Sequence, residues 1–269
     1  MAKRTVRTRR SRESHFSPSL NHRHLMDQME PSMAYDGGDV KKWQRKLRRK
    51  VKELIGLPKG ERVPLGVRSL WRREHELGTI EKIAFAGEPY SDVMAYVCLP
   101  REAERPYPFF VCLQGHTTGA HISIGVERDD VDWGRIGAMG NSGGGTISLF
   151  SAAVLPRLRF AMPSCYFCTF RDSIMSIQHC ADNYVPGLLQ YGEMADVMGL
   201  FAPRPVVLVA GREDSIFPIK GVRKAFRHLK EIYRAAGAEE HCHLVVGPEG
   251  HRFYADLAWK KMVPELGRR

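Results

Sequence analysis

A glycine-rich segment over residues 140–145 constrains the fold of this chain more than any other feature. It follows a short apolar run, precedes a segment with helical patterning, and reads Gly140-Asn141-Ser142-Gly143-Gly144-Gly145. A sharp strand-to-helix turn strains the backbone at its serine and leaves no room for neighbouring side chains, which explains the glycines. The start of the following helix offers free N–H groups to a developing negative charge. We therefore predict that Ser142 is a nucleophile at the edge of a sheet.

Short apolar runs alternate with amphipathic segments along the rest of the chain. Residues 108–113, 135–139 and 205–210 are continuous apolar runs, which are typical of strands covered on both faces in a parallel sheet. Strands that alternate with helices predict an α/β fold with a mainly parallel sheet flanked by helices. The other expected elements are strands at 74–86, 93–99, 159–162 and 242–246, and helices at 143–153, 185–200, 220–236 and 251–262.

The N-terminal quarter carries the whole excess of positive charge. The chain has 269 residues and a net charge of +11 at pH 7, and residues 71–269 are balanced. Residues 1–38 are expected to be a poorly ordered basic leader, residues 39–64 an amphipathic helix and linker, and residues 65–269 the α/β domain. The helix is predicted from the three- and four-residue spacing of Trp43, Leu47, Val51, Leu54 and Ile55, with Asp39 as its N-cap.

A basic terminus of this kind can bind nucleic acid or an acidic membrane surface. The alternative is a solvated helix face behind a frayed leader. We favour the second interpretation because no nucleic-acid-binding module accompanies the charge, so no nucleic-acid partner is expected.

A nucleophilic serine needs a base, and the base needs an acid that orients it. Asp214 follows the apolar run 205–210, where a carboxylate would face the site, and Glu213 is the alternative acid. His251 lies on a loop between glycines and the last predicted helix, within reach of Ser142. The histidines not chosen are His228 on a helix, His241 and His243 in or beside a strand, and His179, which has no evident partner.

Two backbone N–H groups are expected to hold the oxyanion. One belongs to Gly143, directly after the serine, and the other to His116 in the loop Gln114-Gly115-His116 after the strand 108–113. The His116 ring has two interpretations, a substrate contact or a structural hydrogen bond.

The cysteines and the leader bear on location and cofactors. No secretory signal is evident, because Arg9-Arg10 is followed by polar residues, so we expect a cytoplasmic protein with reduced thiols. Cys165 and Cys168 have C-x-x-C spacing, but a second ligand pair is missing, so buried thiols are expected rather than a metal site. A run of about 18 apolar residues is also missing, so no membrane span is predicted.

Five segments carry a further signal: Leu113-Gln114-Gly115-His116-Thr117-Thr118-Gly119, residues 140–145, Ala161-Met162-Pro163-Ser164-Cys165, Gly211-Arg212-Glu213-Asp214 and Gly250-His251-Arg252-Phe253. Together they resemble the acetyl-xylan-esterase-like, dienelactone-hydrolase-related branch of the α/β-hydrolases. The leader residues 16–20 and the Trp43 helix also resemble that branch. The resemblance implies an α/β-hydrolase fold and a serine carboxylic-ester hydrolase without metal or organic cofactor, acting on short acyl groups such as acetyl esters of carbohydrates. Ser142, Asp214 and His251 match its triad positions.

The chain departs from that branch between residues 114 and 134, where family members hold a helix, a strand and another helix. The segment 114–134 is too short to contain two β-α-β crossovers. We therefore interpret the sequence as an α/β-hydrolase shortened by an internal deletion. The strand 93–99 must then pair with 108–113 or leave an apolar edge, which would favour a homo-oligomer. A catalytically impaired relic is therefore the alternative function, ahead of the basic terminus as a binding module.

Overall fold

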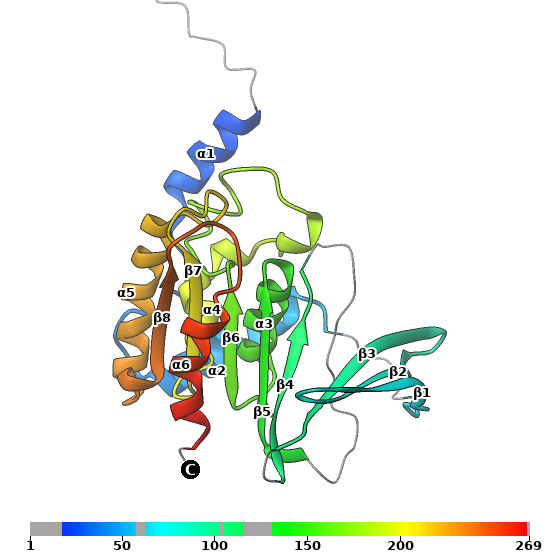
Figure 1. The fold of residues 1–269 in the computed structure, drawn as a ribbon. Coiled ribbons are helices and arrows are strands. Elements are labelled where there is room, and N and C mark those ends of the chain that lie inside the picture. The colour runs from blue at the N-terminus through cyan, green and yellow to red at the C-terminus, as the bar shows by residue number, and fades with distance from the viewer. Residues whose placement is uncertain (1–17, 58–62, 103–104, 116–130, 268–269) are drawn as a thin grey trace, which may run out of the picture. The chain divides into compact units, whose positions relative to one another are not determined.

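The structure, a computed structural model, describes residues 18–57, 63–102, 105–115 and 131–267 (Figure 1). The chain divides into two compact units, Met1–Glu30 and Pro31–Arg269, and the described part of the first contains helix α1. The second unit contains the remaining elements. The helices are α1 Pro18–Gln28, α2 Val40–Leu54, α3 Gly143–Val154, α4 Met194–Gly199, α5 Ile219–Ala235 and α6 Ala255–Leu266, and the strands are β1 Arg68–His75, β2 Gly78–Glu88, β3 Ser91–Pro100, β4 Tyr107–Leu113, β5 Val131–Asn141, β6 Phe160–Ser164, β7 Val206–Gly211 and β8 Cys242–Gly247.

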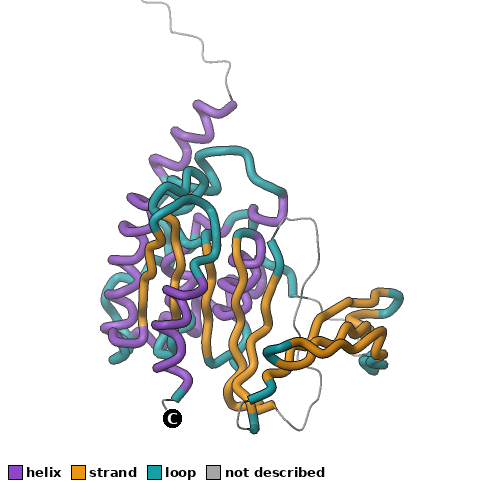
Figure 2. The backbone as a smooth tube through the Cα atoms, viewed as in Figure 1, coloured by secondary structure: helices purple, strands orange, loops and turns teal. Residues whose placement is uncertain are grey.

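The central sheet is parallel and has the strand order β4-β5-β6-β7-β8. The predicted α/β fold with a mainly parallel sheet flanked by helices is therefore confirmed (Figure 2). Because all five strands run in one direction, their carboxyl ends meet at one edge of the sheet. Ser142, Asp214 and His251 all follow carboxyl ends, those of β5, β7 and β8. Parallel pairing thus brings three distant parts of the sequence to the same edge.

The two faces of this sheet have different cores. Along β7, Val206 and Leu208 pack with α2, α3, α4 and α5, whereas Val207 and Val209 pack with α6. This alternation is the period of a strand covered on both faces. On the α6 face, Phe110 of β4 meets the α6 residue Trp259, with ring centroids 5.0 Å apart.

Helix α2 begins and packs as its sequence predicts. The Asp39 side chain accepts a hydrogen bond from the Lys42 backbone N–H at 3.0 Å, which caps the helix. Leu47 and Val51 are fully buried in the larger core. Gln44 donates hydrogen bonds from Nε2 to the Gly199 and Ala202 carbonyls. Most of the stability of such a highly charged helix comes from this apolar stripe rather than from propensity.

A second sheet, of three antiparallel strands, has the order β1-β2-β3. Among the described residues no strand ladder joins β3 to β4, so the expected pairing of 93–99 with 108–113 does not form. The alternative expectation is an unpaired edge, and among the described residues both β3 and β4 are edge strands of their sheets. The three-stranded sheet has a small core of its own, built from Ile83, Phe85, Ala95 and Val97.

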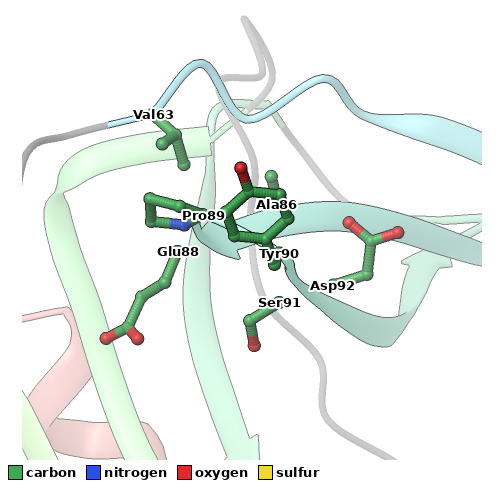
Figure 3. A pocket seen from close by; sticks show the side chains of 7 residues that line it. All are labelled: Val63, Ala86, Glu88, Pro89, Tyr90, Ser91 and Asp92. Atoms are coloured by element: carbon green, nitrogen blue, oxygen red, sulfur yellow. The ribbon is translucent and has the colours of Figure 1, made fainter.

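The hairpin turn of this sheet contains a surface hollow. Tyr90 adopts φ = 63° there and its side chain is fully exposed. Figure 3 shows Glu88 and Asp92 pointing to opposite sides of the turn. The hollow is lined by Val63, Ala86, Glu88, Pro89, Tyr90, Ser91 and Asp92, none of which was predicted to be catalytic.

Three predicted elements have different bounds. The expected strand 74–86 is two strands, because the chain turns at Glu76 and Leu77 between β1 and β2. The expected helix 185–200 is wrong over its first half. Gly187, at φ = 75°, interrupts it, and helix α4 begins only at Met194 behind a capping box of Glu193 and Asp196. The last helix begins at Ala255, so His251 lies in the loop before it.

Candidate active site

The turn after β5 holds Ser142 in a strained conformation. Its backbone has φ = 58° and ψ = −121°, a region that residues with a side chain rarely adopt. The Ser142 N–H donates to the Ser164 carbonyl of the neighbouring strand β6 at 2.9 Å. The turn is therefore fixed to the sheet, and Ser142 is the N-cap residue of helix α3.

The glycines around Ser142 are required by close backbone contacts. A Cβ on Gly144 would overlap the Leu113 carbonyl at the end of β4, and one on Gly145 would lie 2.5 Å from the Ser164 carbonyl oxygen. A Cβ on Gly140 would lie 2.6 Å from the Gly144 carbonyl carbon. The helix α3 consequently approaches the ends of β4 and β6 more closely than any side chain would allow.

Asp214 and His251 form a hydrogen-bonded pair at the same edge of the sheet as this turn. His251 Nδ1 lies 2.8 Å from Asp214 Oδ2, while Asp214 Oδ1 accepts the Ile216 and Phe217 backbone N–H groups. Burial opposes ionisation of Asp214, but His251 and the two N–H groups outweigh it, and the pKa of Asp214 is lowered. Asp214 is thus a buried carboxylate that fixes the orientation of the His251 ring. The alternative acid, Glu213, is exposed.

Three buried polar atoms of the described residues have no hydrogen-bond partner, and their rings surround Phe217. They are Tyr166 Oη, His179 Nε2 and His251 Nε2. Their ring centroids lie 5.5, 5.8 and 5.9 Å from that of Phe217. Burial, together with the nearby His251, lowers the pKa of His179. Unsatisfied buried polar groups are rare in folded proteins, so such a group of them points to a site that binds a ligand.

Two of these residues were not identified from the sequence. Tyr166 follows β6 at the same edge as the predicted triad, so its position on a strand end could have indicated it. His179 lies in a long loop with no motif around it, and only the fold brings it near His251.

The other histidines have structural partners. His228 Nε2 lies 2.8 Å from the buried Asp196 carboxylate, which raises the pKa of His228. His241 and His243 flank the buried Glu265 carboxylate of α6 at 2.7 and 2.8 Å. Among the described residues, none of these three histidines forms a hydrogen bond to the Ser142 turn.

The side expected to hold the oxyanion is partly described. Gly143 is the first residue of α3, where backbone N–H groups are free of helical partners. Gly115 lies against the serine turn, because a Cβ there would be 2.6 Å from the Asn141 carbonyl oxygen and 3.2 Å from Ser142 Cβ. The loop after β4 therefore reaches the Ser142 turn. His116, the next residue, lies outside the described residues.

Cys165 lies close to Asp214 and His251, with ligand atoms of the three side chains within 4.8 Å of one another. It follows β6, has φ = 47°, and donates its thiol hydrogen to the Arg252 carbonyl at 3.3 Å. Burial and the neighbouring Asp214 carboxylate raise the pKa of Cys165 to about 12. Cys168 faces the Pro218 carbonyl instead, so the two thiols of the C-x-x-C segment point to different partners.

Comparison with known proteins adds a sequence relationship to this geometry. The model of the Abhydrolase family matches residues 2–132, just under half of the chain. The Bacillus subtilis (strain 168) protein named "Putative hydrolase YtaP" is 30% identical over 128 residues, which make up 46% of this chain and 43% of YtaP. The chain thus spans less than half the length of this curated relative.

Solved structures resemble the fold over most of the chain. A "putative acetyl xylan esterase" from Bacteroides fragilis NCTC 9343 aligns with a TM-score of 0.71 at 13% identity, and covers 92% of this chain and 85% of its own. A glucuronoyl esterase from Solibacter usitatus aligns with a TM-score of 0.65 at 11% identity, with coverage of 88% and 97%. The fold of the chain is that of the α/β-hydrolases, and its residues 2–132 match a model of that family. The fold that the sequence resemblance implies is confirmed.

The family match ends at residue 132, before the serine turn. It therefore covers none of Ser142, Asp214 and His251. Within the described ranges, no helix is long and apolar enough to cross a membrane.

Proposed function

We propose that this α/β-hydrolase is a serine carboxylic-ester hydrolase that works by two-step acyl transfer. The observation that carries the proposal is the His251–Asp214 pair at the sheet edge that also presents the strained Ser142 turn. His251 Nε2, the atom that a general base needs, is buried and has no partner among the described residues. In enzymes of this type the hydrogen bond from serine to base often tightens only when substrate binds.

Each triad residue has one task in the proposed reaction. His251 Nε2 takes the proton from Ser142 Oγ as this oxygen attacks the ester carbonyl. Asp214 holds the ring so that Nδ1 carries a hydrogen and Nε2 is free to accept one, and it stabilises the imidazolium that forms. The imidazolium then protonates the leaving alcohol. Water, deprotonated by the same histidine, attacks the acyl-enzyme and releases the acid.

The oxyanion of both steps is assigned to two backbone donors, the N–H groups of Gly143 and His116. The contact between Gly115 and the serine turn supports this assignment, because it brings the loop after β4 to the nucleophile. One oxyanion donor is typically worth about 10²–10³ in kcat.

Short acyl groups, in particular acetyl esters of carbohydrates, are the proposed substrates. The names of two structural neighbours, acetyl xylan esterase and glucuronoyl esterase, support a carbohydrate ester. We also propose that the substrate is a small molecule and that the protein has no nucleic-acid partner. A location in the cytoplasm is proposed as well, and it is supported by the six cysteines, none of which is paired.

The experiment is intact-mass labelling of the folded protein with a fluorophosphonate, which modifies activated serines. Ser142→Ala is the test variant, and Ser148→Ala, a buried serine of the same helix, is the matched control. We expect one adduct on the wild type and on Ser148→Ala, and none on Ser142→Ala. Labelling that persists in Ser142→Ala would refute the nucleophile.

A catalytically impaired relic is the second candidate, favoured by the missing ladder between β3 and β4. It predicts cooperative unfolding without any adduct on the wild type. One adduct together with ester hydrolysis would exclude it.

A further inference from the structure

Cys165, Asp214 and His251 bring three metal-binding side chains together at the candidate active site. One thiol sulfur, one carboxylate oxygen and one ring nitrogen lie within 4.8 Å of one another, and Cys165 and Asp214 are buried. Cys165 directly follows β6, and Asp214 and His251 lie in the loops after the adjacent strands β7 and β8. These two loops are joined by hydrogen bonds from the Arg212 and Glu213 N–H groups to the Gly247 and Glu249 carbonyls.

The backbone around Cys165 is fixed in a way that aims its thiol at the pair. The Cys165 N–H donates to the Val209 carbonyl of β7 at 2.8 Å. The sulfur contacts the Arg252 carbonyl, one residue after His251. The thiol thus has little freedom to leave the acid–base pair.

The donor set selects the kind of metal ion. Thiolate, imidazole and carboxylate together suit Zn²⁺ and similar thiophilic cations, whereas Mg²⁺ and Ca²⁺ take oxygen ligands. With bonds of about 2.0–2.3 Å, the ligand atoms of a tetrahedral zinc site lie roughly 3.3–3.8 Å apart. His251 Nδ1 and Asp214 Oδ2, now at 2.8 Å, would separate slightly, and water would complete the shell.

We propose that Cys165, Asp214 and His251 form an inhibitory site for a thiophilic divalent cation such as Zn²⁺. The cation forms a bond to Cys165 Sγ, whose S–H bond breaks and releases one proton to solvent. It forms a second bond to His251 Nδ1, and the hydrogen of Nδ1 moves to Nε2 through solvent. Asp214 supplies the third bond. No electron is transferred, and removal of the cation reverses each step.

Inhibition follows from the position of the ring hydrogen. A base must accept the Ser142 proton on Nε2, and a ring with metal on Nδ1 already carries hydrogen there. The cation thus blocks the proposed esterase chemistry without touching Ser142. Binding itself does not depend on the proposed function, whereas inhibition rests on it.

The first experiment measures binding by titrating Cd²⁺ into the full chain and following the ultraviolet thiolate-to-cadmium charge-transfer band. Cys165→Ser removes the sulfur ligand, and Cys165→Ala is a second variant should serine disturb packing. Cys168→Ser is the matched control, because this buried thiol faces the Pro218 carbonyl. We expect both Cys165 variants to weaken the affinity of the tightest Cd²⁺ site at least about tenfold. Cys168→Ser should leave the Cd²⁺ affinity unchanged, and added Mg²⁺ should not alter the charge-transfer band. Equal Cd²⁺ affinity in the wild type and in both folded Cys165 variants would overturn the proposal.

The second experiment measures inhibition through fluorophosphonate labelling with and without Zn²⁺. We expect Zn²⁺ to slow labelling of the wild type, a chelator to restore it, and Cys165→Ser to need at least about tenfold more Zn²⁺. Equal sensitivity of wild type and Cys165→Ser would overturn the inhibitory role. If no form is labelled even without metal, the proposed function fails, and the Cd²⁺ titration alone decides whether the site exists.

Discussion

Replacement of Asp214 by asparagine tests the proposed acid–base pair most directly. The Asp214 carboxylate accepts three hydrogen bonds, two from backbone N–H groups on Oδ1 and one from His251 on Oδ2. Asparagine keeps a carbonyl oxygen for the backbone donors, but its amide nitrogen cannot accept from Nδ1–H. Nδ1 of His251 must then become a hydrogen-bond acceptor, so the ring hydrogen moves from Nδ1 to Nε2. This is the atom that should take the Ser142 proton.

The expected size of the effect follows from this tautomer change. In Ser-His-Asp enzymes the same substitution lowers kcat by about 10⁴, which equals about 5.4 kcal/mol of transition-state stabilisation. The folded state loses one hydrogen bond to a charged group, worth about 1.5–3 kcal/mol. Asp214→Asn should therefore remain folded while its reaction rate falls far more than its stability.

The assay compares the rates of fluorophosphonate labelling and of 4-nitrophenyl acetate hydrolysis in two variants. Glu213→Gln removes the same charge from the exposed neighbour and should leave both rates unchanged. Urea unfolding verifies that each variant is folded. The reasoning is refuted if folded Asp214→Asn reacts within tenfold of the wild type, or if Glu213→Gln loses as much.

Three further predictions concern stability and association. The hydrogen bond to Asp196 raises the pKa of His228, so the protonated His228 contributes its full stabilisation of the fold below the unfolded pKa of about 6.5, and this stabilisation is lost as pH rises through the higher folded pKa. The urea midpoint of the wild type should therefore fall as pH rises between these two pKa values, and it should fall less in His228→Gln. Leu47→Ala, at a fully buried position of α2, should cost about 2.7–5 kcal/mol in urea unfolding, whereas exposed Arg45→Ala should change stability by less than about 0.5 kcal/mol; equal effects would refute the docking of α2. The unpaired edge of β4 should drive homo-association, and light scattering that gives a monomer at every concentration would contradict this.

The elements that sequence could predict are those whose signal is local. The apolar spacing of Leu47 and Val51 with a cap at Asp39 predicts α2 to within a few residues. The apolar run 205–210 predicts β7 because a doubly covered strand needs no polar positions. The strained serine turn is equally local, since its glycines are explained by contacts within and beside residues 140–145.

The errors arose where a local pattern had more than one physical cause. Leu77 continues the apolar alternation of residues 74–86, yet it is 73% exposed in the turn between β1 and β2. The apolar residues from Val185 to Leu189 suggested a helix, but they fill a core beneath an irregular segment that Gly187 interrupts. His179 has no pattern at all, because only the tertiary fold carries its loop to Phe217. The sequence favours Asp214 and leaves Glu213 as the alternative acid, and of the two only Asp214 is buried.

The position of the missing ladder indicates which part of the catalytic apparatus it affects. Ser142, Asp214 and His251 follow β5, β7 and β8, which are joined through β6 by continuous parallel pairing. The unpaired edge belongs to β4, whose following loop carries only the oxyanion donor assigned to His116. A poorly placed donor costs about 10²–10³ in kcat, whereas loss of a triad residue costs about 10⁴–10⁶. In the proposed reaction the shortened connection should therefore weaken stabilisation of the oxyanion more than it disturbs Ser142, Asp214 and His251, so the proposed esterase should be slow rather than inert.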